Sequence, residues 1–134
     1  MKKWFVLIFL SIILFTTGCS KEQAYIVFNR EAITPENILN ATYAFEAGER
    51  VYYVITIPEY IVTRQLLIQV YKRDNKEGRY GYNLIYGKNI RLSDEQQHYY
   101  TDYFVFNDKG IYEFKVYSKD DPTKELASNI VQIR

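Results

Sequence analysis

The chain has 134 residues, of which 48% are hydrophobic, and its formal net charge is +1. This length suits one domain of ordinary size and is too short for two. Lys2 and Lys3 account for two of the 17 basic side chains, which leaves 15 against the 16 acidic side chains from Cys19 onward. A nearly neutral domain has no long-range field to gather phosphate groups, so we expect no nucleic-acid partner.

The N-terminus has the pattern of a secretory signal. Met1-Lys2-Lys3 forms a positively charged start, residues 4–15 (WFVLIFLSIILF) form an apolar run, and small residues follow. A charged start, an apolar stretch of about 7–15 residues and a small-residue cleavage site are typical of secreted proteins. The apolar run is too short for a membrane-spanning helix, which needs about 20 residues.

The end of this segment carries a second pattern, in Thr17, Gly18 and Cys19. It resembles the lipobox of bacterial lipoproteins, Leu-(Ala/Ser/Thr)-(Gly/Ala)-Cys, with Thr16 where leucine is usual. The resemblance implies that residues 1–18 are a signal peptide, that cleavage follows Thr17 and Gly18, and that Cys19 becomes the lipidated, acylated first residue. The alternatives are an ordinary cleaved signal with an incidental cysteine, or an uncleaved anchor.

Lipid on Cys19 would hold the protein on the extracytoplasmic side of the cell membrane. Ser20 rather than Asp follows the cysteine, and by the same resemblance this favours the outer membrane in a cell that has two. Residues 19–23 would form a short lipidated tether and residues 24–134 the domain. Because Cys19 is the only cysteine, no disulfide can form within the chain.

Short apolar stretches between turn signals predict an all-β domain. Within residues 110–118, for example, Tyr112, Phe114 and Val116 alternate with more polar side chains. Such alternation is typical of antiparallel sheets that are covered on one face. Strands are expected at residues 24–28, 42–45, 50–57, 66–73, 80–86, 99–106, 110–118 and 127–133, with short helical turns at 34–41 and 93–97 and a loop at 119–125.

One motif indicates the architecture more specifically. Asp108, Gly110 and Tyr112 form the pattern Asp-x-Gly-x-Tyr immediately before a predicted strand. This resembles the tyrosine corner of immunoglobulin-like sandwiches, in which the tyrosine hydroxyl bonds back to the backbone. The resemblance implies an immunoglobulin-like antiparallel β-sandwich of about 7–8 strands, with Phe114 where an antibody domain has its second cysteine. The alternative is an ordinary hairpin turn that precedes a tyrosine.

Residues suited to catalysis or metal binding are scarce. His98 is the only histidine, and with the thiol of Cys19 lipidated no nucleophile–base pair is evident, so we expect no enzyme, no cofactor and a surface or capping role for His98. We also expect no metal site. Calcium could use Asp120-Asp121 or Asp74-Asn75-Glu77, but neither stretch has the spacing of a calcium-binding loop and solvated turns explain both.

The abundance of tyrosine is the remaining feature that indicates a function. All 14 tyrosines follow the predicted signal peptide, residues 1–18. Alternation puts Tyr52, Tyr71 and Tyr117 on polar strand faces, and Tyr99 and Tyr100 lie next to His98. Exposed tyrosines are enriched in binding surfaces, but they also stabilise sheets as cross-strand pairs. We therefore expect a non-enzymatic module that binds a protein or glycan. The alternative is a structural subunit of an envelope assembly that docks a partner along a sheet edge.

Overall fold

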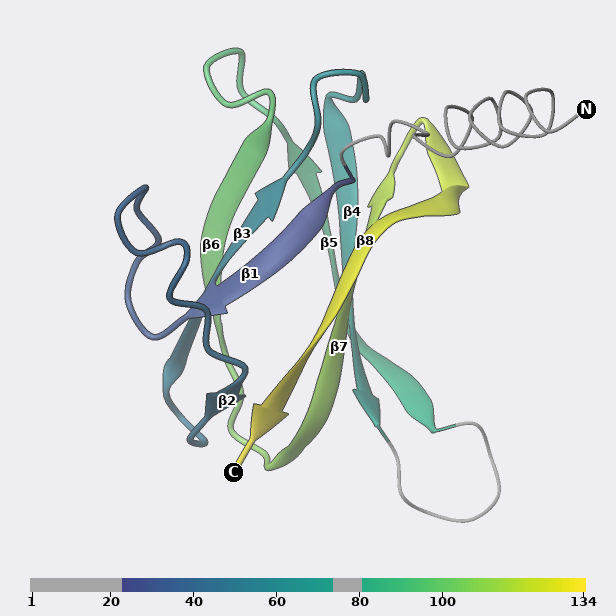
Figure 1. Ribbon diagram of the computed structural model, residues 1–134. Coiled ribbons are helices and arrows are strands. Elements are labelled where there is room, and N and C mark those ends of the chain that lie inside the picture. Colours follow the sequence, from purple (N-terminus) through teal and green to yellow (C-terminus); the bar gives the residue numbers. More distant parts are fainter. Residues whose placement is uncertain (1–22, 74–80) are drawn as a thin grey trace, which may run out of the picture.

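The computed structural model describes residues 23–73 and 81–134 (Figure 1). These residues form eight strands in two sheets that face each other as a β-sandwich, which confirms the all-β fold class. The proposed signal peptide, the lipidation site Cys19 and the Asp74-Asn75-Glu77 stretch lie outside the described residues.

The smaller sheet has three antiparallel strands in the order β1-β3-β6. They are β1 (Tyr25–Asn29), β3 (Arg50–Thr56) and β6 (Tyr99–Val105). The central strand, β3, has neighbours on both sides, and Val51, Tyr53, Val54 and Ile55 on it are buried.

The larger sheet has five strands in the order β2-β8-β7-β4-β5. They are β2 (Ala44–Phe45), β8 (Asp121–Ile133), β7 (Gly110–Ser118), β4 (Gln65–Arg73) and β5 (Tyr82–Arg91). The short β2 runs parallel to β8, and the other pairs are antiparallel. Consecutive strands change sheets on both sides of β2, between β3 and β4, and on both sides of β6, which places segments distant in sequence in the same sheet.

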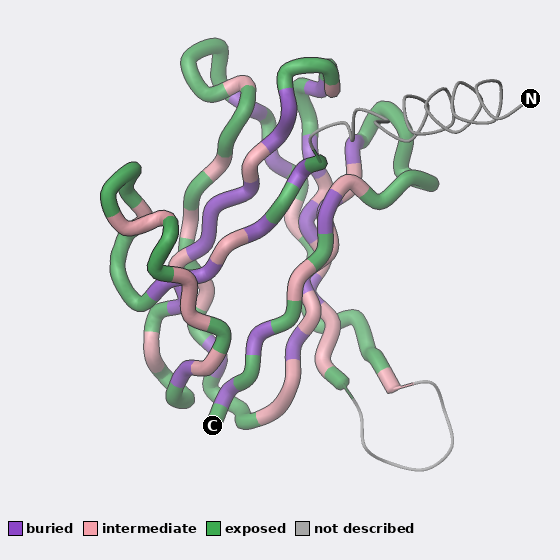
Figure 2. The backbone as a smooth tube through the Cα atoms, in the orientation of Figure 1, coloured by how far each residue is buried: buried purple, intermediate pink, exposed green. Residues whose placement is uncertain are grey.

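The core lies between the sheets, and the predicted alternation places it correctly. Tyr112, Phe114 and Val116 of β7 are buried, while the residues between them are part-exposed, as the alternating colours along the strands in Figure 2 show. Phe114 is 1% exposed. Its ring centroid lies 5.0 Å from that of Phe28 on β1 and 5.5 Å from that of Tyr53 on β3, so it joins the two sheets.

Several of the predicted boundaries are wrong. The strand expected at residues 80–86 is β5, which runs from Tyr82 to Arg91. The expected loop at residues 119–125 is a turn of Lys119 and Asp120, and β8 already begins at Asp121. The pairing of β7 with β8 shifts register on either side of Tyr117, which breaks the period of two that the sequence pattern relies on. Pro122 is tolerated because this part of β8 is an edge, where no backbone N–H is needed.

The segments at 34–41 and 93–97, where a helical turn or two is expected, form turns and bends without a longer helix; in the first, Ile38 N–H donates to Thr34 O at 3.1 Å, as in one helical turn. Ser93 does accept the Gln96 backbone N–H through its hydroxyl, at 3.1 Å, as a helix cap does. Neither segment has an apolar stripe, so no packing energy extends the turn into a helix.

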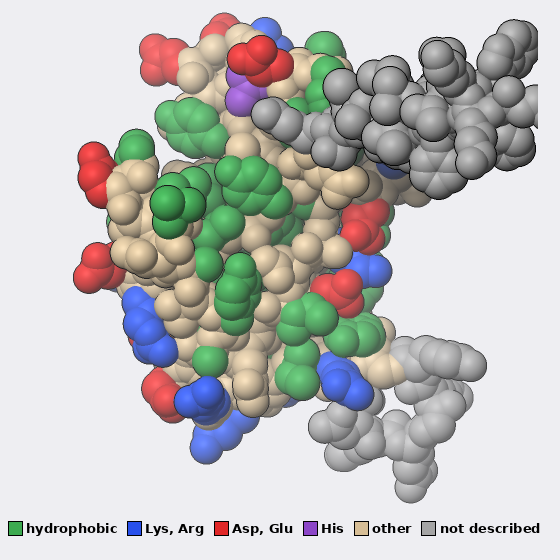
Figure 3. Space-filling model, in the orientation of Figure 1, with side chains coloured by type: hydrophobic (Ala, Val, Ile, Leu, Met, Phe, Trp, Pro, Cys, Tyr) green, Lys and Arg blue, Asp and Glu red, His purple; other side chains and the backbone are tan. Residues whose placement is uncertain are grey.

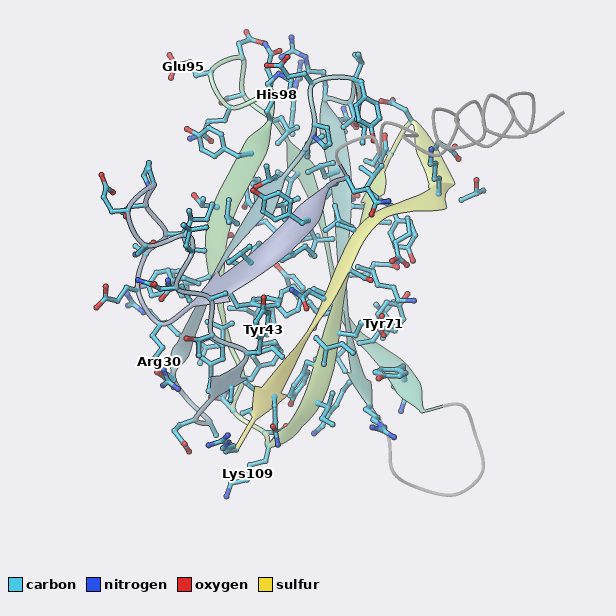
Figure 4. All side chains as sticks on the ribbon, in the orientation of Figure 1. Arg30, Tyr43, Tyr71, Glu95, His98 and Lys109 are labelled. Carbon is cyan, nitrogen blue, oxygen red and sulfur yellow. The ribbon has the colours of Figure 1, made fainter. Side chains whose placement is uncertain are left out.

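The chain enters the domain at one end of the sandwich, which we call the entry end. It consists of residues 23–24 and the loops at 57–64, 92–98 and 119–120 (Figure 1). Backbone hydrogen bonds hold these loops beside the strand ends: Ile57 N–H donates to His98 O at 2.8 Å, and Lys119 N–H to Gln65 O at 3.0 Å. Figure 4 shows Glu95 and His98 at this end and Lys109 at the opposite end.

Candidate functional site

The five tyrosines predicted as a binding surface do not lie together. Tyr52 and Tyr99 lie on the outer face of the three-stranded sheet, whereas Tyr71 and Tyr117 lie on the outer face of the five-stranded sheet. Tyr100 packs inward against the core, with its ring centroid 6.4 Å from that of Tyr53. Adjacent residues in a strand point to opposite faces, so Tyr99 and Tyr100 cannot share a surface.

The outer face of the three-stranded sheet is the strongest candidate for a contact surface, and we call it the tyrosine face. Strand register places its side chains in rows across the sheet. One row holds Tyr25, Thr56 and Tyr99, the next holds Val27, Val54 and Thr101, and the third holds Asn29, Tyr52 and Tyr103. Tyr25, Tyr99 and Tyr103 are each 44–45% exposed.

The middle of this face is densely covered by its own side chains. Val54 points outward, yet it is only 4% exposed because the rows on both sides enclose it. Figure 3 shows a different side of the molecule, on which β1 and β8 run in front; there hydrophobic side chains gather in the middle and charged side chains lie mostly around the periphery. The middle row of the tyrosine face is thus mainly apolar, and the rows on both sides of it carry tyrosine rings with polar hydroxyls.

Arg50 supplies the positive charge at one end of the tyrosine face. Its Nη1 donates a hydrogen bond to the Tyr52 hydroxyl at 3.3 Å, and its guanidinium carbon lies 4.8 Å from the Tyr103 ring centroid. The Tyr52 and Tyr103 ring centroids are 5.6 Å apart. These three residues therefore form a pre-arranged cluster of two aromatic rings and a cation.

A small pocket adjoins this cluster. Its lining includes Ala32, Ile33, Tyr52, Thr101 and Tyr103, and its volume is about 190 Å³. This is below the roughly 300–1,000 Å³ of sites that enclose a whole small molecule. The pocket is large enough for one side chain or one sugar hydroxymethyl group of a larger partner.

The loop over this pocket is held by Asn37. Its Oδ1 accepts the Thr34 backbone N–H at 2.8 Å, and its Nδ2 donates to Ala32 O at 2.9 Å. Its own carbonyl oxygen accepts Asn29 Nδ2 at 3.1 Å. One asparagine thereby fixes the loop against the end of β1, which the sequence pattern alone did not indicate.

The outer face of the five-stranded sheet has a different character. Lys115 Nζ lies 3.8 Å from Glu125 Oε2 and 5.5 Å from the Tyr71 ring centroid, and the Tyr71 hydroxyl donates to Gln69 Oε1 at 2.7 Å. Tyr71, which Figure 4 labels, is thus engaged by its neighbours within the sheet. This fits the alternative interpretation of the tyrosines as sheet-stabilising pairs.

A polar cluster links the edge strands β5 and β6. Lys88 Nζ lies 3.1 Å from Asp102 Oδ2, and the Tyr100 hydroxyl donates to the same oxygen at 3.0 Å. Burial opposes ionisation of Asp102, but hydrogen bonds from Tyr103 N–H, Lys88 and Tyr100 outweigh it, so the pKa of Asp102 lies below its ordinary value. The carboxylate is saturated with donors, which suits structure rather than proton transfer.

The residues considered for catalysis or calcium binding are dispersed. His98 is exposed at the entry end. Asp121 Oδ1 accepts the Thr123 hydroxyl at 2.6 Å, and Asp120 N–H donates to the Ser118 hydroxyl at 3.2 Å. Within residues 23–73 and 81–134, no three His, Cys, Asp or Glu side chains are grouped so that they could hold a metal ion.

The Asp-x-Gly-x-Tyr motif lies at the end opposite the entry end. The Tyr112 hydroxyl donates a hydrogen bond to Asp108 O at 2.7 Å, and Tyr112 is buried. Gly110 has a φ of +151°, and a Cβ there would lie 3.1 Å from Lys72 Cε. Glycine is therefore favoured at this position for two reasons: its backbone conformation is unusual, and the Lys72 side chain approaches its Cα closely.

Comparisons with known proteins find only distant structural likeness. A scan against protein-family models finds no match, and a search of curated proteins finds no significant match. The chain is similar to a hypothetical protein from Pyrococcus horikoshii OT3, at 17% identity and a TM-score of 0.41 over 87% of this chain and 93% of that chain. It is also similar to part of a beta-glucosidase from Listeria innocua, at 14% identity and a TM-score of 0.40 over 87% of this chain and 16% of that chain. Likeness this distant carries no inference about activity.

Proposed function

We propose that the protein is a lipid-anchored, extracytoplasmic binding module without catalytic activity, and that the tyrosine face contacts its partner, a protein or a glycan. The observation that carries this proposal is the clustering of Tyr25, Tyr52, Tyr99 and Tyr103 on one sheet face, beside Arg50 and a small pocket. Tyrosine and arginine are the side chains most enriched in protein contact surfaces. Their rigidity limits the entropy lost on binding.

The lipid anchor is supported by the pattern that ends at Cys19. Two or three acyl chains bind a bilayer stably, whereas one chain binds only marginally. No helix within the described residues is long and apolar enough to cross a membrane. We propose that the lipid on Cys19 provides the membrane attachment.

We also propose that the sandwich is immunoglobulin-like. In such domains one sheet contains strands A, B and E, and the other contains G, F and C. The two-residue β2 is left out of this comparison. The remaining strands, taken in chain order as A, B, C, C′, E, F and G, give the orders A-B-E for β1-β3-β6 and G-F-C-C′ for β8-β7-β4-β5. The Tyr112–Asp108 hydrogen bond and the contact of Phe114 with Tyr53, in place of a disulfide, support the same assignment.

The anchor is tested by the intact mass of the protein from the membrane fraction, wild type beside Cys19→Ala. We expect the wild type to lack residues 1–18 and to carry acyl chains, and the variant to carry none. A wild-type protein without lipid would overturn the anchor and leave a secreted or periplasmic factor.

The binding face is tested with serine substitutions in the lipidated protein reconstituted in vesicles. Tyr103→Ser should weaken binding to envelope proteins or purified envelope polysaccharides by roughly tenfold, as expected for a tyrosine at the centre of an interface. Tyr71→Ser, on the opposite sheet, is the matched control and should bind like the wild type. Equal affinity of all three proteins would rule out the tyrosine face.

A second candidate function rests on the β5 edge. Tyr82, Leu84, Ile85 and Tyr86 are all exposed on this strand, which has no further neighbour among the described strands. An exposed apolar edge strand can accept a strand of another protein. In that case Tyr82→Ser and Leu84→Pro would abolish partner binding, and Tyr103→Ser would leave it unchanged.

A further inference from the structure

An open groove of about 920 Å³ lies at the entry end of the sandwich. Its lining includes Gln23, Tyr25, Ile57, Pro58, Glu59 and Tyr60. The β1–β3 register places Tyr25 opposite Thr56, so the start of the domain and the loop at 57–64 share this surface. Tyr60 is 54% exposed, and Val62 in the same loop is 88% exposed.

The groove lies within a short reach of the proposed lipid. Gln23, which lines it, follows Cys19 by four residues. Four residues span at most about 14 Å even when fully extended. If Cys19 carries its lipid in the bilayer, the entry end cannot move far from the headgroups.

We propose that the entry end rests on the bilayer, with Tyr60 and Val62 in contact with the lipid headgroup layer. This inference depends on the proposed lipidation and adds an orientation to it. Tyrosine suits this position because its ring is apolar and its hydroxyl stays hydrated, which is why it is enriched at membrane interfaces. Transfer of the exposed, apolar Val62 side chain from water into this layer lowers the free energy of the bound state.

The charges at the entry end favour a zwitterionic lipid surface. Arg64 is paired with Asp94 at 2.6 Å. The other charged side chains in the loops and at the adjoining strand ends are Glu59, Glu95, Asp120 and Asp121 against Arg91 and Lys119, which leaves an excess of acid. Anionic lipids would repel this excess, whereas a zwitterionic surface, which has no net charge, would not.

The orientation predicts that the opposite end points away from the membrane. Lys109 lies there, directly before β7, which runs nine residues to Ser118 at the entry end. Nine strand residues span about 27 Å. Probes at residues 62 and 109 should therefore report very different depths.

The test uses tryptophan as a depth probe. The only tryptophan is Trp4, which the proposed cleavage removes, so a new tryptophan would be the sole indole of the lipidated protein. Val62→Trp and Lys109→Trp are both at exposed positions and should fold like the wild type. Each is reconstituted into phosphatidylcholine vesicles that contain brominated lipid, after its intact mass has established acylation of Cys19.

We expect Val62→Trp to shift its emission to shorter wavelength and lose intensity to the brominated lipid, and Lys109→Trp to show neither change. Replacing part of the phosphatidylcholine with phosphatidylglycerol should weaken the quenching of Val62→Trp at low salt. Quenching of both variants, of neither, or of Lys109→Trp alone would overturn the orientation while leaving the anchor intact. Absence of acyl chains in the mass measurement would instead overturn the proposed function itself.

Discussion

The side-chain amide of Asn129 joins the two sheets: its Nδ2 on β8 donates a 2.7 Å hydrogen bond to the carbonyl oxygen of Ile26 on β1. Its Oδ1 accepts the backbone N–H of Ile130 at 2.9 Å. β1 and β8 belong to different sheets, so no strand ladder satisfies these backbone groups. On the opposite side of the sandwich, Lys88 and Asp102 connect the edge strands β5 and β6.

Asn129→Ala should destabilise the domain by about 1–3 kcal/mol, because it leaves the Ile26 carbonyl and the Ile130 N–H without this partner at the seam. Urea denaturation followed by circular dichroism measures the change. Ser128→Ala, at the neighbouring exposed position, is the control and should stay within about 0.5 kcal/mol of the wild type. Equal stability of the two variants would show that the amide is not a structural link.

Asp102→Asn should reduce stability at neutral pH, and the difference from the wild type should shrink in acid. Because the folded-state pKa of Asp102 is lowered, its charge contributes stability above the unfolded-state pKa of about 3.9, and this contribution is lost as pH falls through the folded-state value. Asparagine retains an acceptor for Tyr103 N–H, but its amide NH2 replaces Oδ2, so the variant removes the charge together with the hydrogen bonds from Lys88 and Tyr100. The effect should be at most about 1 kcal/mol, since both partners are partly solvated.

Urea midpoints at pH 7 and pH 3 measure this pH dependence, with Glu95→Gln at an exposed loop position as the control. A difference between wild type and Asp102→Asn that is the same at both pH values would contradict the assignment. Lys88 provides a second check, because the hydrogen bond to Asp102 raises its pKa. Its contribution should persist below pH 10 and disappear only at still higher pH.

Tyr112→Phe should destabilise the domain by about 1 kcal/mol, through loss of the hydrogen bond to Asp108. The aromatic contact with Phe106, at a centroid distance of 4.1 Å, is kept. The denaturant midpoint should fall with an unchanged m-value, because the folded surface is the same. Tyr99→Phe, at an exposed position, should leave the midpoint unaltered, and an equal fall for both variants would refute a specific role of the Tyr112 hydroxyl.

Gly48→Ala and Gly87→Ala should have opposite effects. Gly48 has a φ of +85° with open space around its Cα, so alanine there costs about 1 kcal/mol of backbone strain alone. Gly87 lies in β5, and a Cβ would be 4.0 Å from the nearest atom, Ile68 O. Alanine at that position should stabilise the strand by roughly 0.5 kcal/mol. Thermal unfolding of the two variants measures both changes, and shifts of the same sign in their midpoints would contradict the prediction.

Most strands could be predicted because the alternation of apolar and polar residues that indicates a strand lies within the strand's own sequence. Residues 110–118 alternate in hydrophobicity, and the strand and its buried face follow directly from that pattern. The prediction fails where contacts with neighbouring strands, rather than the sequence of the segment itself, determine the structure. The register shift around Tyr117 extends the β7–β8 hairpin, and the neighbouring rows of side chains bury Val54 on a face expected to be polar.

The candidate site shows the same division. Alternation correctly places Tyr52 and Tyr71 on outward faces, but it contains no information on which sheet each strand joins. β3 and β4 are consecutive in the chain and lie in different sheets, so the two tyrosines lie on different outer faces of the sandwich. Tyr103 belongs to the tyrosine face by the same alternation as Tyr99, and strand order was needed to bring both beside Tyr52 and Tyr25.

By itself, the sequence determined the all-β fold class, most strand positions, the inward faces of strands such as β7 and the Asp-x-Gly-x-Tyr turn, since these depend on local periodicity and on the conformational freedom of glycine. The tertiary structure decided the two sheets, their strand order, the Asn129 and Asp102 links and the composition of the tyrosine face. Each of these depends on contacts between segments far apart in the chain, and such contacts leave no local periodic trace.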